Sequence, residues 1–132
     1  AVSPVGRWSA CTSNESGRDE VYVTTFPEPA RRWQVSTTGG TFPRWSRDGN
    51  ELYFGTAVGD LLVAEVGGDG EAFDVGRVRA LHSWNLATSF RRPFDLTADG
   101  EDLLVIRGQA MQSRDPLKIV LNWDAALDKE RR

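Results

Sequence analysis

Residues 41–55 decide the fold, and they read Thr41-Phe42-Pro43-Arg44-Trp45-Ser46-Arg47-Asp48-Gly49-Asn50-Glu51-Leu52-Tyr53-Phe54-Gly55. Aromatic and aliphatic residues stand on both sides of Asp48-Gly49, and these residue types favour half-buried strands. Glycine readily adopts the left-handed backbone angles of a tight connection, and Asp-Gly is a frequent hairpin pair. The stretch therefore predicts two antiparallel strands joined by a tight turn.

The same pattern recurs in the chain. Residues 92–106 repeat it closely, and residues 3–12 repeat it more loosely. The turn glycines Gly6, Gly49 and Gly100 lie 43 and 51 residues apart, close to the roughly 40–50 residues of a four-stranded propeller blade. The spacing predicts three related antiparallel units.

The sequence resembles the C-terminal part of TolB-like (WD-repeat-like) β-propellers. The repeat of that family has a Pro-x-Trp-Ser-Pro-Asp-Gly turn, a Tyr-Val strand and a short outer strand. Its counterparts here are Pro43–Gly49, Ser13–Val23 and Trp33–Ser36. Residues 119–123 are similar to the close of the propellers attached to some bacterial serine/threonine kinases. The sequence departs from the family pattern at Val5, where Asp is usual, and at Arg47 and Ala98, where Pro is usual.

The resemblance implies an all-β fold, a partial β-propeller of about three four-stranded antiparallel blades in a single domain, 1–132. The blades are expected at residues 1–38, 41–82 and 90–123, and a short C-terminal helix is expected over 123–130. The first blade lacks its innermost strand, which would lie before Ala1, and the last lacks an outer strand. We therefore expect a processed, trimmed or excised piece of a longer protein; simple removal of an initiator methionine is the alternative for the start at Ala1.

The strands expected in chain order cover residues 7–12, 20–25, 33–36, 42–46, 51–55, 61–66, 78–81, 92–96, 102–106 and 118–121. The strand near 78–81 is weak, and Gly67-Gly68-Asp69-Gly70-Glu71 before it is typical of a mobile connection. Cys11 is the single cysteine, so no internal disulfide can form. Its place on a predicted strand indicates a small buried side chain.

Composition indicates one modest domain with a hydrophobic core, because 39% of the 132 residues are hydrophobic and 27% are charged. The net charge of −3 does not favour nucleic acid or an anionic membrane, and no apolar run approaches the roughly 18–20 residues of a membrane span. An unfinished ring would expose strand edges and two blade faces. We therefore expect a protein partner or self-association, such as a two-fold dimer that completes a six-bladed ring.

The motifs do not indicate an enzyme, a metal site or a cofactor. The sequence contains no Gly-x-Ser-x-Gly elbow and no phosphate-binding glycine loop. One cysteine and one histidine cannot form a zinc site without carboxylates. Asp48 and Asp99 are expected to accept hydrogen bonds from turn amides rather than to bind calcium.

Candidate partner-binding residues are Arg44, Arg91, Arg92, His82 and Trp84. Guanidinium groups pair with carboxylates and stack on aromatic rings, and Arg44 and Arg92 lie on or beside predicted inner strands, near the expected channel mouth. Pairing with acidic residues of neighbouring blades is the alternative for these arginines. The alternative for His82 is an ordinary surface or half-buried residue. Most of the five tryptophans are expected between blades, with Trp84 free in its loop.

The leading hypothesis is a non-catalytic propeller scaffold that binds a protein, as part of a larger protein or assembly. One alternative is the substrate-gating propeller of a prolyl-oligopeptidase-like serine peptidase, without its hydrolase domain. Another is a propeller that binds a small molecule or sugar at its channel mouth. All three depend on the resemblance, because propellers support many functions.

Overall fold

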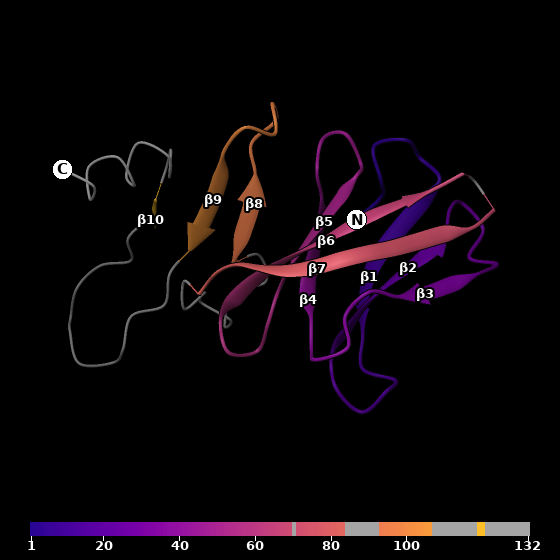
Figure 1. Cartoon of the computed structure of the whole chain (residues 1–132), viewed down its shortest axis with the longest axis horizontal. Helices are drawn as coiled ribbons and strands as arrows, with labels where there is room; N and C mark the ends of the chain where they lie inside the picture. Colours follow the sequence, from indigo (N-terminus) through magenta and orange to yellow (C-terminus); the bar gives the residue numbers. More distant parts are fainter. Residues whose placement is uncertain (70, 84–92, 107–118, 121–132) are drawn as a thin grey trace.

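The computed structural model describes residues 1–69, 71–83, 93–106 and 119–120. The strands within these ranges are β1 (Trp8–Ser13), β2 (Glu20–Thr25), β3 (Arg32–Gln34), β4 (Thr41–Trp45), β5 (Glu51–Gly55), β6 (Asp60–Gly68), β7 (Phe73–Ser83), β8 (Phe94–Leu96), β9 (Leu103–Ile106) and β10 (Ile119–Val120). They form three antiparallel sheets (Figure 1): the first sheet, β1-β2-β3; the middle sheet, β4-β5-β6-β7; and the third sheet, β8-β9 with the two-residue β10 beside β9. The predicted all-β class is confirmed, and no helix in the described ranges is long and apolar enough to span a membrane.

Where both ends lie in the described ranges, the predicted strands agree with the observed ones to within two residues, with one exception; the ends predicted at Arg92, Lys118 and Leu121 lie outside these ranges. β7 is far longer than the weak strand predicted near 78–81, and Gly67 and Gly68, expected in the connection before it, belong to β6, with Gly68 opposite Phe73. Phe73 explains the difference, because its side chain is 4% exposed and its ring lies 5.2 Å from that of Trp8. The helix predicted over 123–130 lies outside the described residues.

The turn after β4 is closed by a side chain. The Ser46 N–H donates to Glu51 O (2.9 Å), the Gly49 N–H donates to Ser46 O (3.0 Å), and Ser46 Oγ accepts the Glu51 N–H (3.0 Å). Gly49 has φ 76°, a left-handed angle that favours glycine. Asp48 does not share this angle, and instead its Oδ1 accepts the Asn50 N–H at 3.0 Å.

The other two sheets repeat this turn. Ser3 with Gly6 and Thr97 with Gly100 make the same three bonds, and the two glycines have φ 69° and 75°. Asp99 accepts the Glu101 N–H at 3.0 Å. The repeat is therefore confirmed as local structure, as is the predicted turn role of both aspartates.

The first sheet contains part of an inner strand that the sequence placed wholly before Ala1. Val2 forms an antiparallel bridge to Ser9, and the Ala10 N–H donates to Ala1 O at 2.7 Å. Residues 1–3 therefore lie beside β1, as β4 lies beside β5.

The middle sheet is covered on both faces. One face packs against the first sheet through Leu52, Phe54, Ala64, Val66, Trp8, Ala10, Val21 and Val23. The other face packs against the third sheet through Phe42, Tyr53, Leu61, Phe94, Leu96, Leu103 and Val105. Leu52-Tyr53-Phe54 is a continuous apolar run because successive strand residues face opposite sides and both sides are covered.

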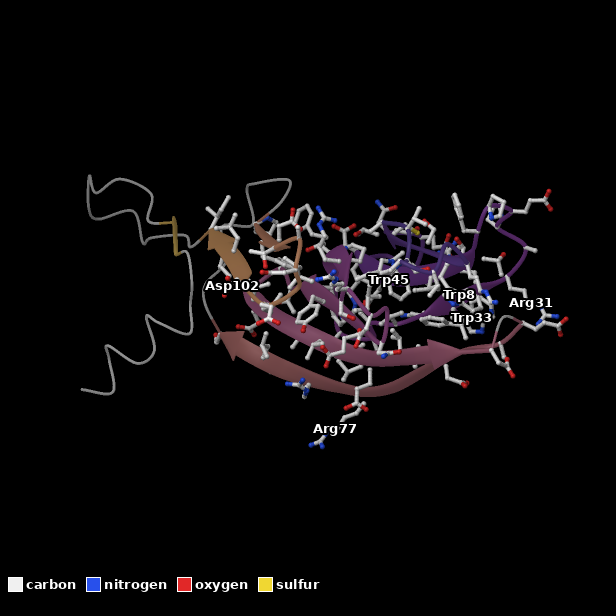
Figure 2. The ribbon with its side chains drawn as sticks, turned by 90° about the horizontal axis from the view of Figure 1, so that it is seen from above. Trp8, Arg31, Trp33, Trp45, Arg77 and Asp102 are labelled. Atoms are coloured by element: carbon white, nitrogen blue, oxygen red, sulfur yellow. The ribbon has the colours of Figure 1, made fainter. Side chains whose placement is uncertain are left out.

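Three of the five tryptophans, labelled in Figure 2, belong to the core between the first and middle sheets and surround Phe73. The rings of Trp8, Trp33 and Trp45 lie 5.2, 5.8 and 6.2 Å from the Phe73 ring. These three indoles therefore pack between sheets, as predicted.

Cys11 is exposed, so the prediction that it is buried was wrong. Trp8 and Ala10 of the same strand are 5% and 1% exposed and face the middle sheet. Because side chains alternate along a strand, Ser9 and Cys11 lie on the opposite face, which no described sheet covers.

Candidate functional site

The innermost segments of all three sheets line one hollow of about 340 Å³, called here the inner hollow. Its walls come from residues 1, 2 and 4, from Arg44–Arg47 at the end of β4, and from residues 95–98 and 100 at the end of β8. Segments far apart in the sequence therefore meet here, and one of the predicted partner-binding residues, Arg44, lies among them.

Arg44 connects the middle and third sheets. Its Nε lies 3.5 Å from Asp95 Oδ1, and its Nη1 donates to Pro43 O at 2.8 Å. The side chains of Arg44 and Asp95 are 21% and 45% exposed, so this ion pair contributes no more than about 1 kcal/mol to stability. The structure therefore gives Arg44 the alternative role, pairing with an acidic residue of the neighbouring sheet, while part of its guanidinium still faces the hollow.

Arg47 lies on the rim of the inner hollow, where the turns of successive sheets meet. Its Nη1 donates to Asp99 O at 3.1 Å, and a Cβ built at Gly100 would lie 2.9 Å from Arg47 Cβ. The residue one repeat earlier, Pro4, similarly lies 3.6 Å from a Cβ built at Gly49. In both cases the residue after the turn serine lies against the glycine of the next turn.

The described part of the chain does not place the other predicted site residues beside Arg44. His82 lies in β7 opposite Leu61. Arg91, Arg92 and Trp84 lie outside the described residues, so their place near the hollow stays a prediction.

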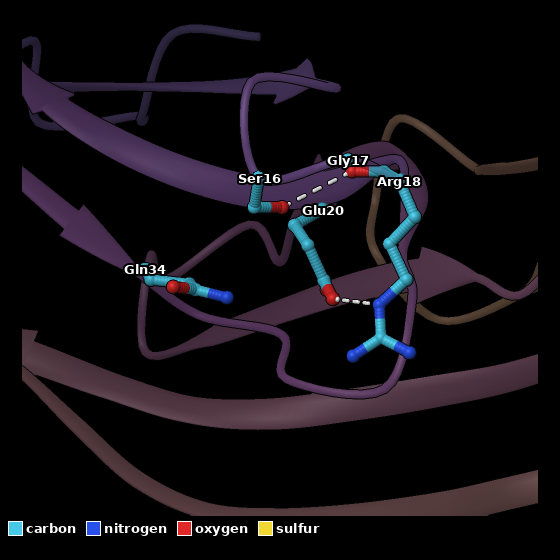
Figure 3. A pocket seen from close by; sticks show the side chains of 5 residues that line it. All are labelled: Ser16, Gly17, Arg18, Glu20 and Gln34. Carbon is cyan, nitrogen blue, oxygen red and sulfur yellow. Dashed lines mark hydrogen bonds and ion pairs between the residues drawn. The ribbon is translucent and has the colours of Figure 1, made fainter.

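A second hollow, of about 360 Å³, lies at the start of β2 and is lined by Ser16, Gly17, Arg18, Glu20 and Gln34 (Figure 3). Glu20 is 1% exposed and accepts hydrogen bonds from Arg18 Nε at 2.7 Å, from the Gly39 N–H at 3.1 Å, and from Ser36 Oγ. Sequence reasoning missed this residue. The only signal in the sequence is that Glu20 is the first residue of a predicted strand and that Ser36 and Gly39 lie at or near the connection to the next unit.

The electrostatics of Glu20 are those of a structural carboxylate. Burial alone would raise its pKa, but the hydrogen bonds from Ser36, Arg18 and Gly39 together lower the pKa below its ordinary value. The carboxylate therefore stays ionised and fastens β2 to the connection that leads into β4.

The buried polar side chains around both hollows are held by hydrogen bonds. Within the described ranges, every buried side-chain nitrogen or oxygen has a hydrogen-bond partner, and no cluster of three His, Cys, Asp or Glu side chains could hold a metal ion. Ser46 Oγ on the rim of the inner hollow donates to Asp48 Oδ1 at 2.6 Å and accepts the Glu51 N–H. This hydroxyl is therefore committed to closing its own turn.

No family model, curated protein or solved structure matches this chain. The inner hollow, with Arg44 and Arg47 in its wall, is the candidate functional site.

Proposed function

We propose that the chain is part of a β-propeller that acts as a non-catalytic scaffold and binds a protein partner at the inner hollow. The observation that carries the proposal is the burial of both faces of the middle sheet. In a two-sheet sandwich each sheet buries one face, whereas a propeller stacks blade upon blade around a central channel. The hollow lined by the innermost segment of each sheet fits such a channel wall.

The contacts between turns support the same proposal. Pro4 lies against Gly49 where the first sheet meets the middle sheet, and Arg47 lies against Gly100 where the middle sheet meets the third. The two junctions therefore use equivalent positions of the repeat. Contacts at equivalent positions of successive units are expected when one repeat is stacked upon the next.

A binding role is favoured over an enzymatic one by the side chains around the hollow. Ser46 is held by its own turn, and Arg44 and Arg47 are the cationic groups of the wall. Guanidinium groups bind carboxylates with defined geometry and are frequent in protein interfaces. The partner is therefore expected to present carboxylates to this wall.

The charge reversal R44E tests the binding site, with R77E as the matched control because Arg77 is exposed on β7, away from the hollow. The full chain is immobilised and used to capture proteins from a lysate of the source cells. Proteins retained by the wild type and by R77E but lost with R44E support the hollow as the site. Equal capture by all three chains refutes it.

Peptidase and glycosidase assays on the purified chain separate the scaffold from the enzymatic alternative. Turnover that follows the chain through purification would refute the non-catalytic role. Small-molecule binding has one observation in its favour, because the hollow's volume of about 340 Å³ falls at the lower end of the range for ligand pockets. A ligand-induced rise in melting temperature that R44E abolishes would favour it.

A further inference from the structure

The wall of the inner hollow already contains a carboxylate beside the arginine that is proposed to bind the partner. Arg44 of β4 and Asp95 of β8 both line the hollow, and Arg44 Nε lies 3.5 Å from Asp95 Oδ1. Opposite charges at this distance attract each other, and like charges repel. A partner carboxylate that approaches Arg44 therefore meets a cation that Asp95 has already taken.

Arg44 does not depend on Asp95 for its orientation. Its Nη1 donates to Pro43 O at 2.8 Å, within the usual range of N–H···O hydrogen bonds. The separation of 3.5 Å between its Nε and Asp95 Oδ1 exceeds that range. The backbone carbonyl, rather than the carboxylate, therefore fixes the guanidinium.

Asp95 in turn does not depend on Arg44. Its Oδ1 accepts the Leu96 N–H at 2.9 Å, so the carboxylate has a backbone donor of its own. Its side chain is 45% exposed, so water solvates the carboxylate when the pair separates. Pairs between partly exposed groups hold together weakly. Asp95 therefore leaves Arg44 at little cost.

We propose that Asp95 is an internal competitor, which occupies Arg44 in the free chain and is displaced by a carboxylate of the partner. This inference rests on the proposed binding of a protein at the inner hollow, and it adds the residue that limits the affinity. A variant that lacks the competing charge is expected to bind an acidic partner more tightly than the wild type.

The competitor also indicates what kind of segment the wall selects. Exchanging Asp95 for one partner carboxylate replaces one partly exposed ion pair with another, so a single carboxylate gains little. Arg47 lines the same hollow, and its Nη1 donates to a backbone carbonyl, Asp99 O. A segment with several carboxylates gains a second charge-assisted contact there. The partner is therefore expected to present an acidic segment rather than a lone carboxylate.

The test measures the binding of a fluorescein-labelled hexaglutamate peptide to the purified full chain, by fluorescence anisotropy at low ionic strength. D95N removes the competing charge and keeps an oxygen that can accept the Leu96 N–H. D74N is the matched control, because Asp74 is exposed on β7, outside the hollow, and its loss changes the net charge equally. We expect D95N to bind the peptide about two- to fivefold more tightly than D74N, and R44E to bind it more weakly than the wild type.

The outcomes separate this inference from the proposed function. Equal affinities of D95N and D74N, together with weak binding by R44E, refute the competitor and leave the binding site intact. Weaker binding by D95N than by D74N also refutes the competitor, because Asp95 then orients Arg44. Unchanged binding by R44E, or no binding by any chain, refutes the hollow as a carboxylate site and the inference with it.

Two further variants test the mechanism. In an R44Q background, D95N and D74N are expected to bind the peptide equally, because the competitor acts only through Arg44; a tightening by D95N that persists there refutes the mechanism. R47Q is expected to weaken binding by the wild-type chain, and an unchanged affinity refutes the second contact. Circular dichroism checks the folding of each variant. If D95N is unfolded, D95S, whose hydroxyl can also accept the Leu96 N–H, gives the same comparison.

Discussion

Replacing Glu20 with alanine removes the carboxylate that fastens the first sheet to the connection leading into the middle sheet. Glu20 is 1% exposed and accepts hydrogen bonds from Ser36 Oγ, the Gly39 N–H and Arg18 Nε. A hydrogen bond to a charged group contributes roughly 1.5–3 kcal/mol. The Arg18 side chain is 60% exposed, so its share is at most about 1 kcal/mol. Taking the lower end of that range for the bonds from Ser36 and Gly39 and adding the Arg18 share, we expect Glu20→Ala to lower the free energy of unfolding by about 3–4 kcal/mol.

The assay is urea denaturation at neutral pH, followed by tryptophan fluorescence. Glu15→Ala is the matched control, because Glu15 also pairs with an arginine, Arg32, but is 56% exposed. This control is expected to cost between zero and about 1 kcal/mol. If the two substitutions destabilise the protein equally, the structural role assigned to Glu20 is refuted.

The pH dependence of the Glu20 effect has a defined sign. Because the pKa of Glu20 is lowered in the folded state from its ordinary value of 4.5, its contribution to stability is complete above that value and is lost as the pH falls through the folded pKa. The difference in unfolding free energy between the wild type and Glu20→Gln is therefore expected to shrink in acid. A difference that stays constant from neutral pH into acid would contradict the lowered pKa.

Gly100→Ala is expected to lower the melting temperature more than Gly49→Ala. Both positions require left-handed angles, which cost about 1–2 kcal/mol for alanine, but only the Cβ at Gly100 would lie within 3 Å of a neighbour, Arg47. Equal losses of stability would contradict this close contact. Phe73→Ala should lower the unfolding free energy by about 3–5 kcal/mol in urea; a loss below 1 kcal/mol would refute its burial at 4% exposure. Burial, and to a smaller extent the hydrogen bond to Glu51, raises the pKa of Tyr53 to about 12. Stability is therefore expected to fall as the pH rises above about 10, and Tyr53→Phe should remove that part of the fall; an ultraviolet titration that ionises every tyrosine near pH 10 would contradict the raised pKa.

Local signals were enough to predict most of the fold. The hairpins at 42–55 and 92–106 depend on alternating apolar residues and a turn glycine, which lie close together in the sequence. The bounds of β2 and β5 were predicted to the residue for the same reason. Whether the sheets belong to a closed ring remains a proposal.

Features that depend on contacts between sheets were not predicted. The glycine-rich stretch before Phe73 indicates a loop, and only the tryptophans of the first and middle sheets explain why β7 begins there. Cys11 was expected to be buried because strand cysteines usually are, but the side of the strand that is covered depends on where the middle sheet lies.

The candidate site was predicted only in part. Arg44 was a candidate, and its pairing with an acidic residue of the neighbouring sheet was the stated alternative, because guanidinium groups pair with carboxylates. Glu20 was missed, since its partners Ser36 and Gly39 lie in a connection whose course the sequence does not indicate. Arg91, Arg92 and Trp84 stay predictions.

The indoles between the first two sheets give the protein a built-in optical probe. Trp8 and Trp33 of the first sheet lie 5.4 Å apart with their rings nearly perpendicular, at 87°, and both rings also lie against Phe73 of the middle sheet. Separation of the first sheet from Phe73 would change the surroundings of both chromophores at once. Spectroscopy can therefore follow the docking of these two sheets without any attached dye.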